Sequence, residues 1–326
     1  MKTQELSRQV LQGDRRALAK AITVIENDQR SAAKLLTALR PPGHAFVLGV
    51  TGPPGTGKST LVDRLIELHR KKGLKVGVIA VDPTSPITGG ALLGDRIRMA
   101  DHAVDKGVYI RSMASRGWSG GLSRATSEVV QVMDAAGYDF ILIETVGIGQ
   151  SDIDVVSVSH AVLVVLMPGM GDDVQMSKAG LMEIGDVYVV NKGDLEGADL
   201  MVVSLLSLVR TMKSRSPPVI KVSALSGNGI EELGSVLDGI RSKFSEGSRD
   251  MRLKATKGMM LEMAKGDVME SFIKSSNAMA EKLSVEVLTG KTTVAEAARR
   301  LAGRAPVFSS SAHTGVLRVR RRSHRA

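Results

Sequence analysis

Hydrophobic positions along this chain change their spacing twice, and the changes divide it into three parts. Up to residue 43 the apolar residues recur every three or four positions, which is the spacing of an amphipathic helix. From residue 44 to about 245, short apolar runs alternate with helical patterns. Beyond residue 246 the pattern is helical again and rich in Met and Lys, with a break at 290–293 where Thr293 is a candidate N-cap.

Seven apolar runs in the middle part predict β-strands. Several of them are apolar at every position, as strands are when helices cover both faces of a sheet. The runs are residues 46–50, 75–81, 108–112, 140–144, 161–167, 187–191 and 219–223. Their alternation with helices predicts an α/β fold with a mostly parallel sheet and helices on both faces.

Polar or glycine-rich clusters follow these runs, at residues 82–96, 116–121, 144–151, 167–173, 191–194 and 223–227. Ligands of open α/β sheets bind beyond the carboxyl ends of the strands. We therefore expect the functional site at that edge of the sheet.

The cluster after the first run carries the most specific motif. Its residues are Gly52, Pro53, Pro54, Gly55, Thr56, Gly57, Lys58 and Ser59, which fit G-x-x-x-x-G-K-[ST], and a helical pattern continues from Thr60. Backbone N–H groups of such a loop wrap a phosphate at a helix N-terminus. Lys58 is expected to reach the β and γ phosphates, and the Ser59 hydroxyl to ligate Mg²⁺. A plain Gly/Pro turn has no need of Lys58 and Ser59, so the sequence predicts a P-loop NTPase domain.

Two later loops indicate which nucleotide is bound. Asn191-Lys192-x-Asp194 follows the sixth run, and a carboxylate at Asp194 can accept two hydrogen bonds from guanine that adenine cannot offer. The Asn191 amide can brace the loop or contact N7, and the Lys192 stem can lie along the base. Ser223-Ala224-Leu225, after the seventh run, suits a loop whose backbone N–H faces guanine O6. The pair of loops predicts GTP, not ATP.

Acidic residues after the second and fourth runs are candidates for the metal and for catalysis. Glu144 is expected on the Mg²⁺ side, and the Gly147 N–H at the γ-phosphate. Asp82 and Asp95 are further candidates for Mg²⁺ or its waters, although Asp82 before a proline also fits an Asx turn. Gln150 is a candidate for orienting water. With these residues, Lys58, Asp82, Asp95, Glu144 and Gln150 form the predicted catalytic set.

Three arginines, Arg96, Arg98 and Arg116, are close enough in sequence to these loops to be considered as an arginine finger. No sequence feature identifies any of them as one. Without a finger supplied in cis, hydrolysis is expected to be slow until a partner supplies or orders one.

Composition is that of a soluble globular protein, with 43% hydrophobic and 24% charged residues among 326. The chain has no cysteine, which excludes disulfides, thiolate metal sites and thiol nucleophiles. No secretory signal is visible, and no apolar run approaches the ~20 residues of a membrane span. We therefore expect a cytoplasmic protein without membrane contact.

The formal charge of +10 belongs mostly to one end of the chain. No acid follows Glu296, and eight arginines do; without them the remaining formal charge is +2. Such a tail is usually solvated and poorly ordered. Contact with an acidic partner and contact with nucleic acid remain the alternatives for it, and nucleic acid is the less expected of the two.

Longer motifs resemble one family, the MeaB/ArgK GTPases associated with methylmalonyl-CoA mutase. The resemblance covers about residues 15–301 and rests on these segments: GPPGTGKST, VDPTSPITGGALLGDRIRM, SRGWSGGL, IETVGIGQSD, VLMPGMGDDVQMSKAG, VVNKGD and GKTTVAEAARRL. It implies a homodimer built through the C-terminal helices. It also implies GTP hydrolysis that gates adenosylcobalamin delivery to an acyl-CoA mutase and protects or rescues the mutase, with no cobalamin bound by this chain itself.

The resemblance also assigns three switch segments, at residues 82–95, 144–152 and 168–178. In the third, Asp172, Gln175 and Lys178 are the polar members expected to couple the nucleotide to the mutase. The chain departs from the family at Trp118-Ser119, at Gly193, where Ala is usual, and at Asp152, where Glu is usual. None of these touches a phosphate-loop group, so they bear on partner contacts.

From these patterns we predict four segments: a helical extension at 1–43, the GTPase domain at 44–245, a helical dimerisation arm at 246–303 and a disordered basic tail at 304–326. The main alternative function is an accessory kinase or ATPase of lysine/arginine/ornithine transport, a label that relatives have carried. Nickel insertion is disfavoured because the chain has no cysteine and only six scattered histidines.

Overall fold

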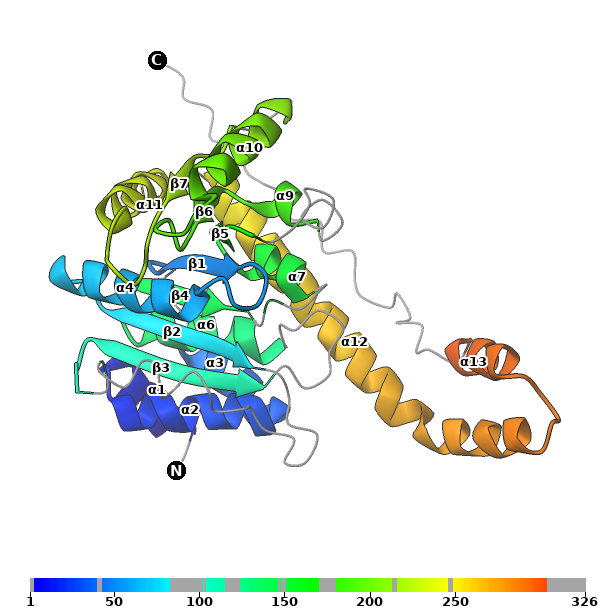
Figure 1. The fold of residues 1–326 in the computed structure, drawn as a ribbon. Coiled ribbons are helices and arrows are strands. Elements are labelled where there is room, and N and C mark those ends of the chain that lie inside the picture. The colour runs from blue at the N-terminus through cyan, green and yellow to red at the C-terminus, as the bar shows by residue number, and fades with distance from the viewer. Residues whose placement is uncertain are drawn as a thin grey trace, which may run out of the picture. The chain divides into compact units, whose positions relative to one another are not determined.

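The computed structural model describes the chain except for residues 1–2, 40–42, 83–101, 103, 115–123, 146, 148–150, 170–179, 213–215, 246–248 and 304–326. Within the described part, seven strands form one sheet in the order β3-β2-β4-β1-β5-β6-β7, and every paired strand runs parallel to its neighbour (Figure 1). The strands are β1 Phe46–Thr51, β2 Val76–Asp82, β3 Val108–Ala114, β4 Phe140–Glu144, β5 Ala161–Leu166, β6 Val187–Val190 and β7 Val219–Lys221. The predicted α/β fold with a parallel sheet is confirmed.

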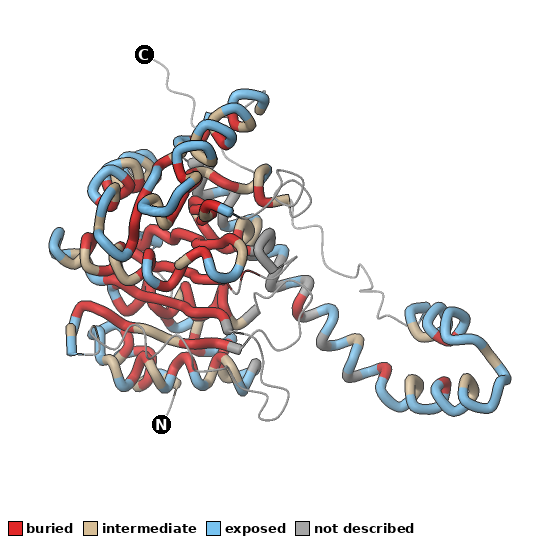
Figure 2. Tube along the Cα trace, in the orientation of Figure 1, coloured by how far each residue is buried: buried red, intermediate tan, exposed pale blue. Residues whose placement is uncertain are grey.

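The middle of the sheet is buried on both faces. Every residue of β1, β4, β5 and β6 is buried, which is what their unbroken apolar runs predict (Figure 2). Strand β1 lies between β4 and β5, with Val50 opposite Glu144. This register brings the carboxyl ends of β1 and β4 together at the start of the phosphate-binding motif.

Helices cover the two faces of the sheet with separate cores. The helices of the main body are α1 Thr3–Leu11, α2 Arg15–Asn27, α3 Gln29–Leu39, α4 Lys58–Lys71, α6 Arg124–Ala135, α7 Ser151–Val158, α9 Leu181–Ile184, α10 Ala198–Thr211 and α11 Ile230–Ser245. On one face, α4 and α11 pack leucines against Phe46, Leu48 and Val50 of β1. The other core contains Val47 of the same strand together with buried residues of α1, α2, α3, α6, α7, α9 and α10. Successive side chains of a strand point to opposite faces of the sheet, so neighbouring residues of β1 belong to opposite cores.

The entry into β1 is fixed by a buried carboxylate. Asp134 of α6 accepts backbone N–H groups from Gly43 at 2.7 Å, His44 at 3.1 Å and Ala45 at 2.9 Å. These bonds satisfy amides that would otherwise lose their water partners. They hold the chain between α3 and β1, so the strand enters the sheet at a fixed position.

The chain divides into two compact units, Met1–Met263 and Ala264–Ala326. Helix α12, Arg249–Leu288, runs through the division, and inside the first unit its Gly258 lies against α7, where a Cβ would come within 2.6 Å of the Ser157 carbonyl oxygen. The four segments predicted from the sequence stay a prediction. Among the described residues, no helix is long and apolar enough to cross a membrane.

In the second unit, α13, Val294–Ala302, lies against the end of α12. The Thr293 hydroxyl accepts the Glu296 N–H at 3.2 Å, so Thr293 is the N-cap that the sequence predicts. Arg300 of α13 pairs with Glu286 of α12 at 2.8 Å. Between the helices lies an apolar groove of about 390 Å³, at which Leu288 and Val294 are 87% and 70% exposed.

Candidate functional site

The phosphate-binding motif forms the turn between β1 and α4. Gly57 is the N-cap of α4 in the left-handed conformation, with φ 84°, and Lys58 and Ser59 are the first residues of the helix. A Cβ at Gly57 would lie 2.5 Å from Asn191 Nδ2, so both the backbone conformation and the close approach require glycine. The loop therefore presents backbone N–H groups at a helix N-terminus, which is an anion-binding arrangement.

Lys58 is buried and lies over this loop. Its ammonium donates to the carbonyl oxygens of Gly52 at 2.8 Å and Pro53 at 3.1 Å. Gly147, from the segment after β4, approaches the same point with φ 83°, and a Cβ there would come within 2.6 Å of Lys58 Nζ. The structure thus brings together the predicted lysine and the predicted γ-phosphate-binding glycine.

Ser59 and Glu144 meet at the adjoining ends of α4 and β4. The Ser59 hydroxyl donates to Glu144 Oε1 at 2.6 Å, and both residues are buried. Next to them, Thr145 Oγ1 donates to Thr51 Oγ1 at 3.0 Å and the Thr145 N–H donates to the Val50 carbonyl. A hydroxyl and a carboxylate side by side are the oxygen ligands that Mg²⁺ prefers.

This pair fits a magnesium ion that is shared with a nucleotide. Within the described ranges, no group of three or more His, Cys, Asp or Glu side chains gathers where a metal ion would bind. Mg²⁺ commonly keeps several waters and takes one or two protein ligands plus substrate phosphates, so a two-residue site is sufficient.

Other predicted residues fall outside what the structure describes. These are Asp95, Gln150, Asp172, Gln175 and Lys178, together with Arg96, Arg98 and Arg116. Asp82 is the last residue of β2, opposite Ala114 of β3, and its side chain is not among the described ones. The roles predicted for all of these residues stay predictions.

Asn191 braces three segments of the site. Its buried side chain donates through Nδ2 to the Thr56 carbonyl at 2.8 Å and accepts the Ala224 N–H through Oδ1 at 3.0 Å. It therefore connects the phosphate loop to the loop of Ser223, Ala224 and Leu225. The Asn191 side chain therefore braces the loops, which is one of the two roles expected from the sequence.

Asp194 is exposed at the mouth of the site and is held by its neighbours. The Ser223 hydroxyl donates to Asp194 Oδ1 at 2.5 Å. This bond, with the backbone N–H of Asp194 and the charge of Lys192, holds the pKa of the carboxyl below its ordinary value. Asp194 is therefore an ionised, oriented acceptor at neutral pH. Lys192 has a left-handed backbone, with φ 54°.

Gly193 has a structural reason for departing from the usual alanine. Its N–H donates to the Val222 carbonyl at 2.8 Å, and a Cβ at Gly193 would lie 2.9 Å from that same oxygen. An alanine would require the two loops to separate slightly. The departure therefore concerns the packing of these loops against each other.

Sequence reasoning missed Arg64 on the outer side of α4. Its guanidinium donates to the carbonyl oxygens of Ala224 and Leu225, at 2.9 and 3.0 Å. Arginine on an amphipathic helix is normally a solvated residue, so no local signal marks this one. Thr60, also on α4, is exposed.

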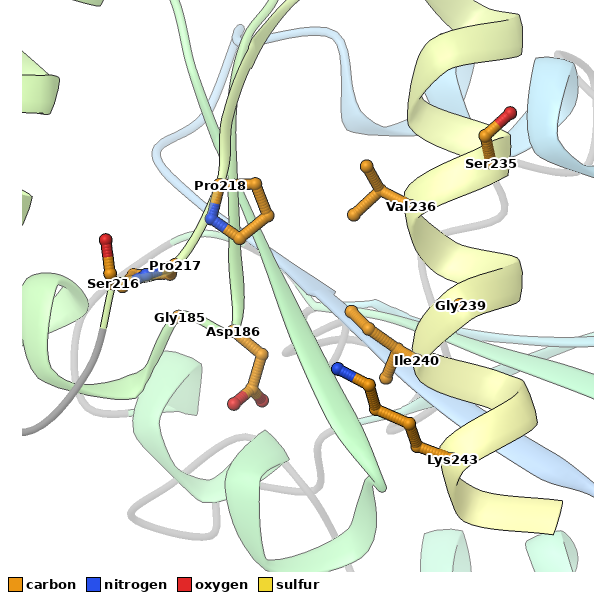
Figure 3. Close-up of a pocket in the computed structure, with 10 residues that line it drawn as sticks. All are labelled: Gly185, Asp186, Ser216, Pro217, Pro218, Ser235, Val236, Gly239, Ile240 and Lys243. Carbon is orange, nitrogen blue, oxygen red and sulfur yellow. The ribbon is translucent and has the colours of Figure 1, made fainter. Parts of the chain in front are cut away.

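A second groove, of about 470 Å³, is lined by the residues that Figure 3 labels. It lies at the amino ends of β6 and β7, away from the phosphate loop, which follows the carboxyl end of β1. It is bounded by residues that precede β6 and β7, including Asp186 and Pro218, and by residues 235–243 of α11, including Lys243. Asp186 Oδ2 already accepts the Val162 N–H at 2.9 Å. Because it faces the amino ends of the strands, this groove takes no part in the phosphate-loop site.

Comparison with known proteins agrees with the geometry. The family model described as methylmalonyl Co-A mutase-associated GTPase MeaB matches residues 18–277. A putative GTPase of Pyrococcus horikoshii is 52% identical over 70% of this chain and 74% of its own length. GTPase ArgK of Escherichia coli is 39% identical over 75% and 78%. The mouse methylmalonic aciduria type A homolog, a mitochondrial protein, is 36% identical over 69% of this chain and 59% of its own.

Among solved structures, one described as a LAO/AO transport system kinase superposes with a TM-score of 0.67 at 26% identity. It covers 92% of this chain and 96% of its own. The likeness supports the P-loop NTPase fold over nearly the whole length of both chains.

Proposed function

This chain belongs to the MeaB family of GTPases, and from that premise we propose that it is a GTP-driven chaperone of an adenosylcobalamin-dependent acyl-CoA mutase. In this proposal it gates the loading of adenosylcobalamin into methylmalonyl-CoA mutase, or a related mutase, and protects or reactivates that enzyme. The observation that carries it is the family match over residues 18–277, whose description names the mutase. The mouse relative named for methylmalonic aciduria supports the same client.

GTP binding is assigned to two halves of one site. The phosphate loop and Lys58 take the phosphates, for which the ammonium exchanges the Gly52 and Pro53 carbonyls for phosphate oxygens. Asp194, already ionised and oriented by Ser223, takes the guanine N1–H and amine. An adenine base has neither the N1–H nor the 2-amino group that Asp194 would bind. GTP is therefore the proposed substrate.

For hydrolysis, Ser59 and Glu144 are the residues that would hold Mg²⁺. When bound, Mg²⁺ neutralises charge on the β and γ phosphate oxygens. Gly147 places its backbone beside Lys58, where an N–H can stabilise the γ-phosphate as charge develops. We propose slow hydrolysis by the chain alone and acceleration by the mutase, acting through the segment that holds Asp172, Gln175 and Lys178.

Self-association is proposed through the second unit. The groove between α12 and α13 is lined by Leu283, Val287, Leu301 and other apolar residues, and it leaves Leu288 and Val294 largely exposed. A second copy of this chain would remove that surface from water. Light scattering of the purified protein tests this: Leu288→Glu combined with Val294→Glu is expected to convert dimers to monomers, and a monomeric wild type would contradict it.

The function is tested by GTP hydrolysis of the purified protein, alone and with a purified acyl-CoA mutase from the same genome, with ATP as the comparison substrate. We expect slow GTP turnover that the mutase accelerates, and loading of adenosylcobalamin that depends on hydrolysis. Lys58→Ala is the matched control for contaminating activity. Equal turnover with and without the mutase would count against the chaperone proposal while leaving the GTPase in place.

The competing proposal is a kinase of a transport system, which the description of the superposed structure favours. A kinase would transfer the γ-phosphate of ATP to a protein acceptor, whereas a GTPase transfers that of GTP to water. The Asn191-to-Asp194 loop favours guanine and therefore the second reaction. Labelled γ-phosphate recovered on protein instead of as inorganic phosphate would reverse this ranking.

A further inference from the structure

Arg64 occupies an unusual place on the helix that opens with Lys58 and Ser59. Its Nε donates to the Ala224 carbonyl at 2.9 Å, and its Nη2 donates to the Leu225 carbonyl at 3.0 Å. On the other side of the guanidinium, Nη1 donates to Glu67 at 3.0 Å. Only a third of the Arg64 side chain is exposed.

The planar guanidinium explains why one side chain can bind two consecutive carbonyl oxygens. Nε and Nη2 form one edge of a rigid fork, and that edge meets two consecutive carbonyl oxygens. Glu67, three residues further along α4, holds the opposite edge and so restricts rotation of the group. The carbonyls of Ala224 and Leu225 are therefore fixed relative to α4.

These bonds close a ring around the base-binding side of the site. Arg64 joins α4 to Ala224, whose N–H joins the loop to Asn191. The Asn191 side chain donates to the Thr56 carbonyl of the phosphate loop. That loop leads directly into α4, which closes the ring. Ser223, in the same loop as Ala224, donates to Asp194. Arg64 is thus one of the links in this ring, and it is the link that attaches the Ser223-to-Leu225 loop to α4.

We propose that Arg64 is a positioning residue of the guanine pocket. It binds no part of the nucleotide; it holds the Ser223-to-Leu225 loop on the helix whose first turn holds the phosphates. This inference rests on the proposed guanine pocket and adds a residue to it. Its consequence is that loss of Arg64 weakens recognition of the base and leaves recognition of the phosphates intact.

The test is competition against a fluorescent GDP derivative, with GDP, ADP and inorganic tripolyphosphate as competitors. For Arg64→Ala we expect GDP to bind about tenfold more weakly, because GDP keeps its own contacts but part of its binding free energy must then order the loop that the two lost hydrogen bonds had held. The preference for GDP over ADP is expected to fall by the same factor, and tripolyphosphate affinity to stay unchanged. In turnover, KM for GTP rises while kcat is preserved.

Two further variants separate positioning from bulk stability. Arg64→Lys retains the charge but lacks the fork, so we expect an intermediate loss of the GDP preference. Arg70→Ala is the matched control: Arg70 is also on α4 and pairs with Asp105, away from the base loops. This control is expected to keep the wild-type preference for GDP.

Each outcome has a separate meaning. A wild type that binds GDP and ADP equally would overturn the guanine pocket itself. A wild type that prefers GDP, with the preference unchanged in Arg64→Ala, would overturn the positioning role and leave the proposed function standing. Equal weakening of GDP and tripolyphosphate would show that Arg64 supports the whole helix, which also overturns the inference.

Discussion

Mild acid is expected to destabilise this protein through one buried histidine. His69, near the end of α4, is fully buried and stacks on Phe140 of β4 with ring centroids 3.9 Å apart. Among the described residues, neither of its ring nitrogens has a hydrogen-bond partner. Burial, followed by the positive charge of Lys72, lowers the pKa of His69 to about 4, while Asp238 opposes the shift and Arg241 adds to it.

The sign follows from proton binding. In the unfolded chain the imidazole has its ordinary pKa of about 6.5, so between pH 6.5 and 4 the unfolded state binds more protons than the folded one. The neutral ring therefore supports folding fully above pH 6.5, and this contribution is lost as pH falls. Linkage between these two pKa values gives a loss of about 2 kcal/mol between pH 7.5 and 5, and a limit of about 3 kcal/mol below pH 4.

Urea unfolding followed by far-UV circular dichroism at pH 7.5 and 5.0 measures this loss. Other groups also titrate in this range, so the informative quantity is the difference in pH dependence between wild type and His69→Leu. The variant places an apolar side chain against Phe140 and removes the titrating imidazole. We expect the variant to lose about 2 kcal/mol less than the wild type between the two pH values. His44→Leu, at an exposed position, is the control. Parallel pH profiles for wild type and His69→Leu would refute the reasoning.

Three substitutions in the site have distinct expected effects. Lys58→Ala is expected to abolish GTP turnover without changing the far-UV spectrum, and retained turnover would remove the loop from the phosphate site. Asp194→Asn is expected to weaken GTP and improve xanthosine triphosphate, because the amide complements the altered base; binding competition between the two nucleotides checks this. Glu144→Gln keeps an oxygen acceptor for Ser59 and loses the charge, so the Mg²⁺ concentration for half-maximal hydrolysis is expected to rise about tenfold, equivalent to about 1.4 kcal/mol.

The sequence was sufficient to predict the strands because strands that are buried on both faces are apolar at nearly every position. The ends were less well predicted. The sixth apolar run predicts a strand that includes Asn191, yet β6 ends at Val190 and the Asn191 side chain bonds to the phosphate loop. Conversely, β2 extends one residue beyond the predicted end at 81, because Asp82 still pairs with Ala114 of β3. Strand ends depend on neighbouring chain segments, which local composition does not describe.

Long-range pairing was also beyond sequence reasoning. Nothing in the runs themselves indicates that β4 lies between β2 and β1, yet this order places Glu144 beside Ser59. Motif residues were identified as candidates from the sequence because their spacing is that of phosphate- and base-binding loops, and their roles stay predictions. Arg64 was not, because its role depends on carbonyl oxygens 160 residues away in the sequence.

The contacts of α4 explain how one helix can connect both halves of the proposed site. Its first turn carries Ser59 against Glu144, at the carboxyl end of β4, and its last turn carries His69 against Phe140, at the amino end of the same strand. Between these two attachments, Arg64 holds the base loop. A helix fixed to one strand at both ends has little freedom to tilt, so α4 holds the phosphate loop and the Ser223-to-Leu225 loop of the proposed site at a fixed distance from each other. Preorganisation of this kind would reduce the free energy lost to ordering when a nucleotide binds the proposed site.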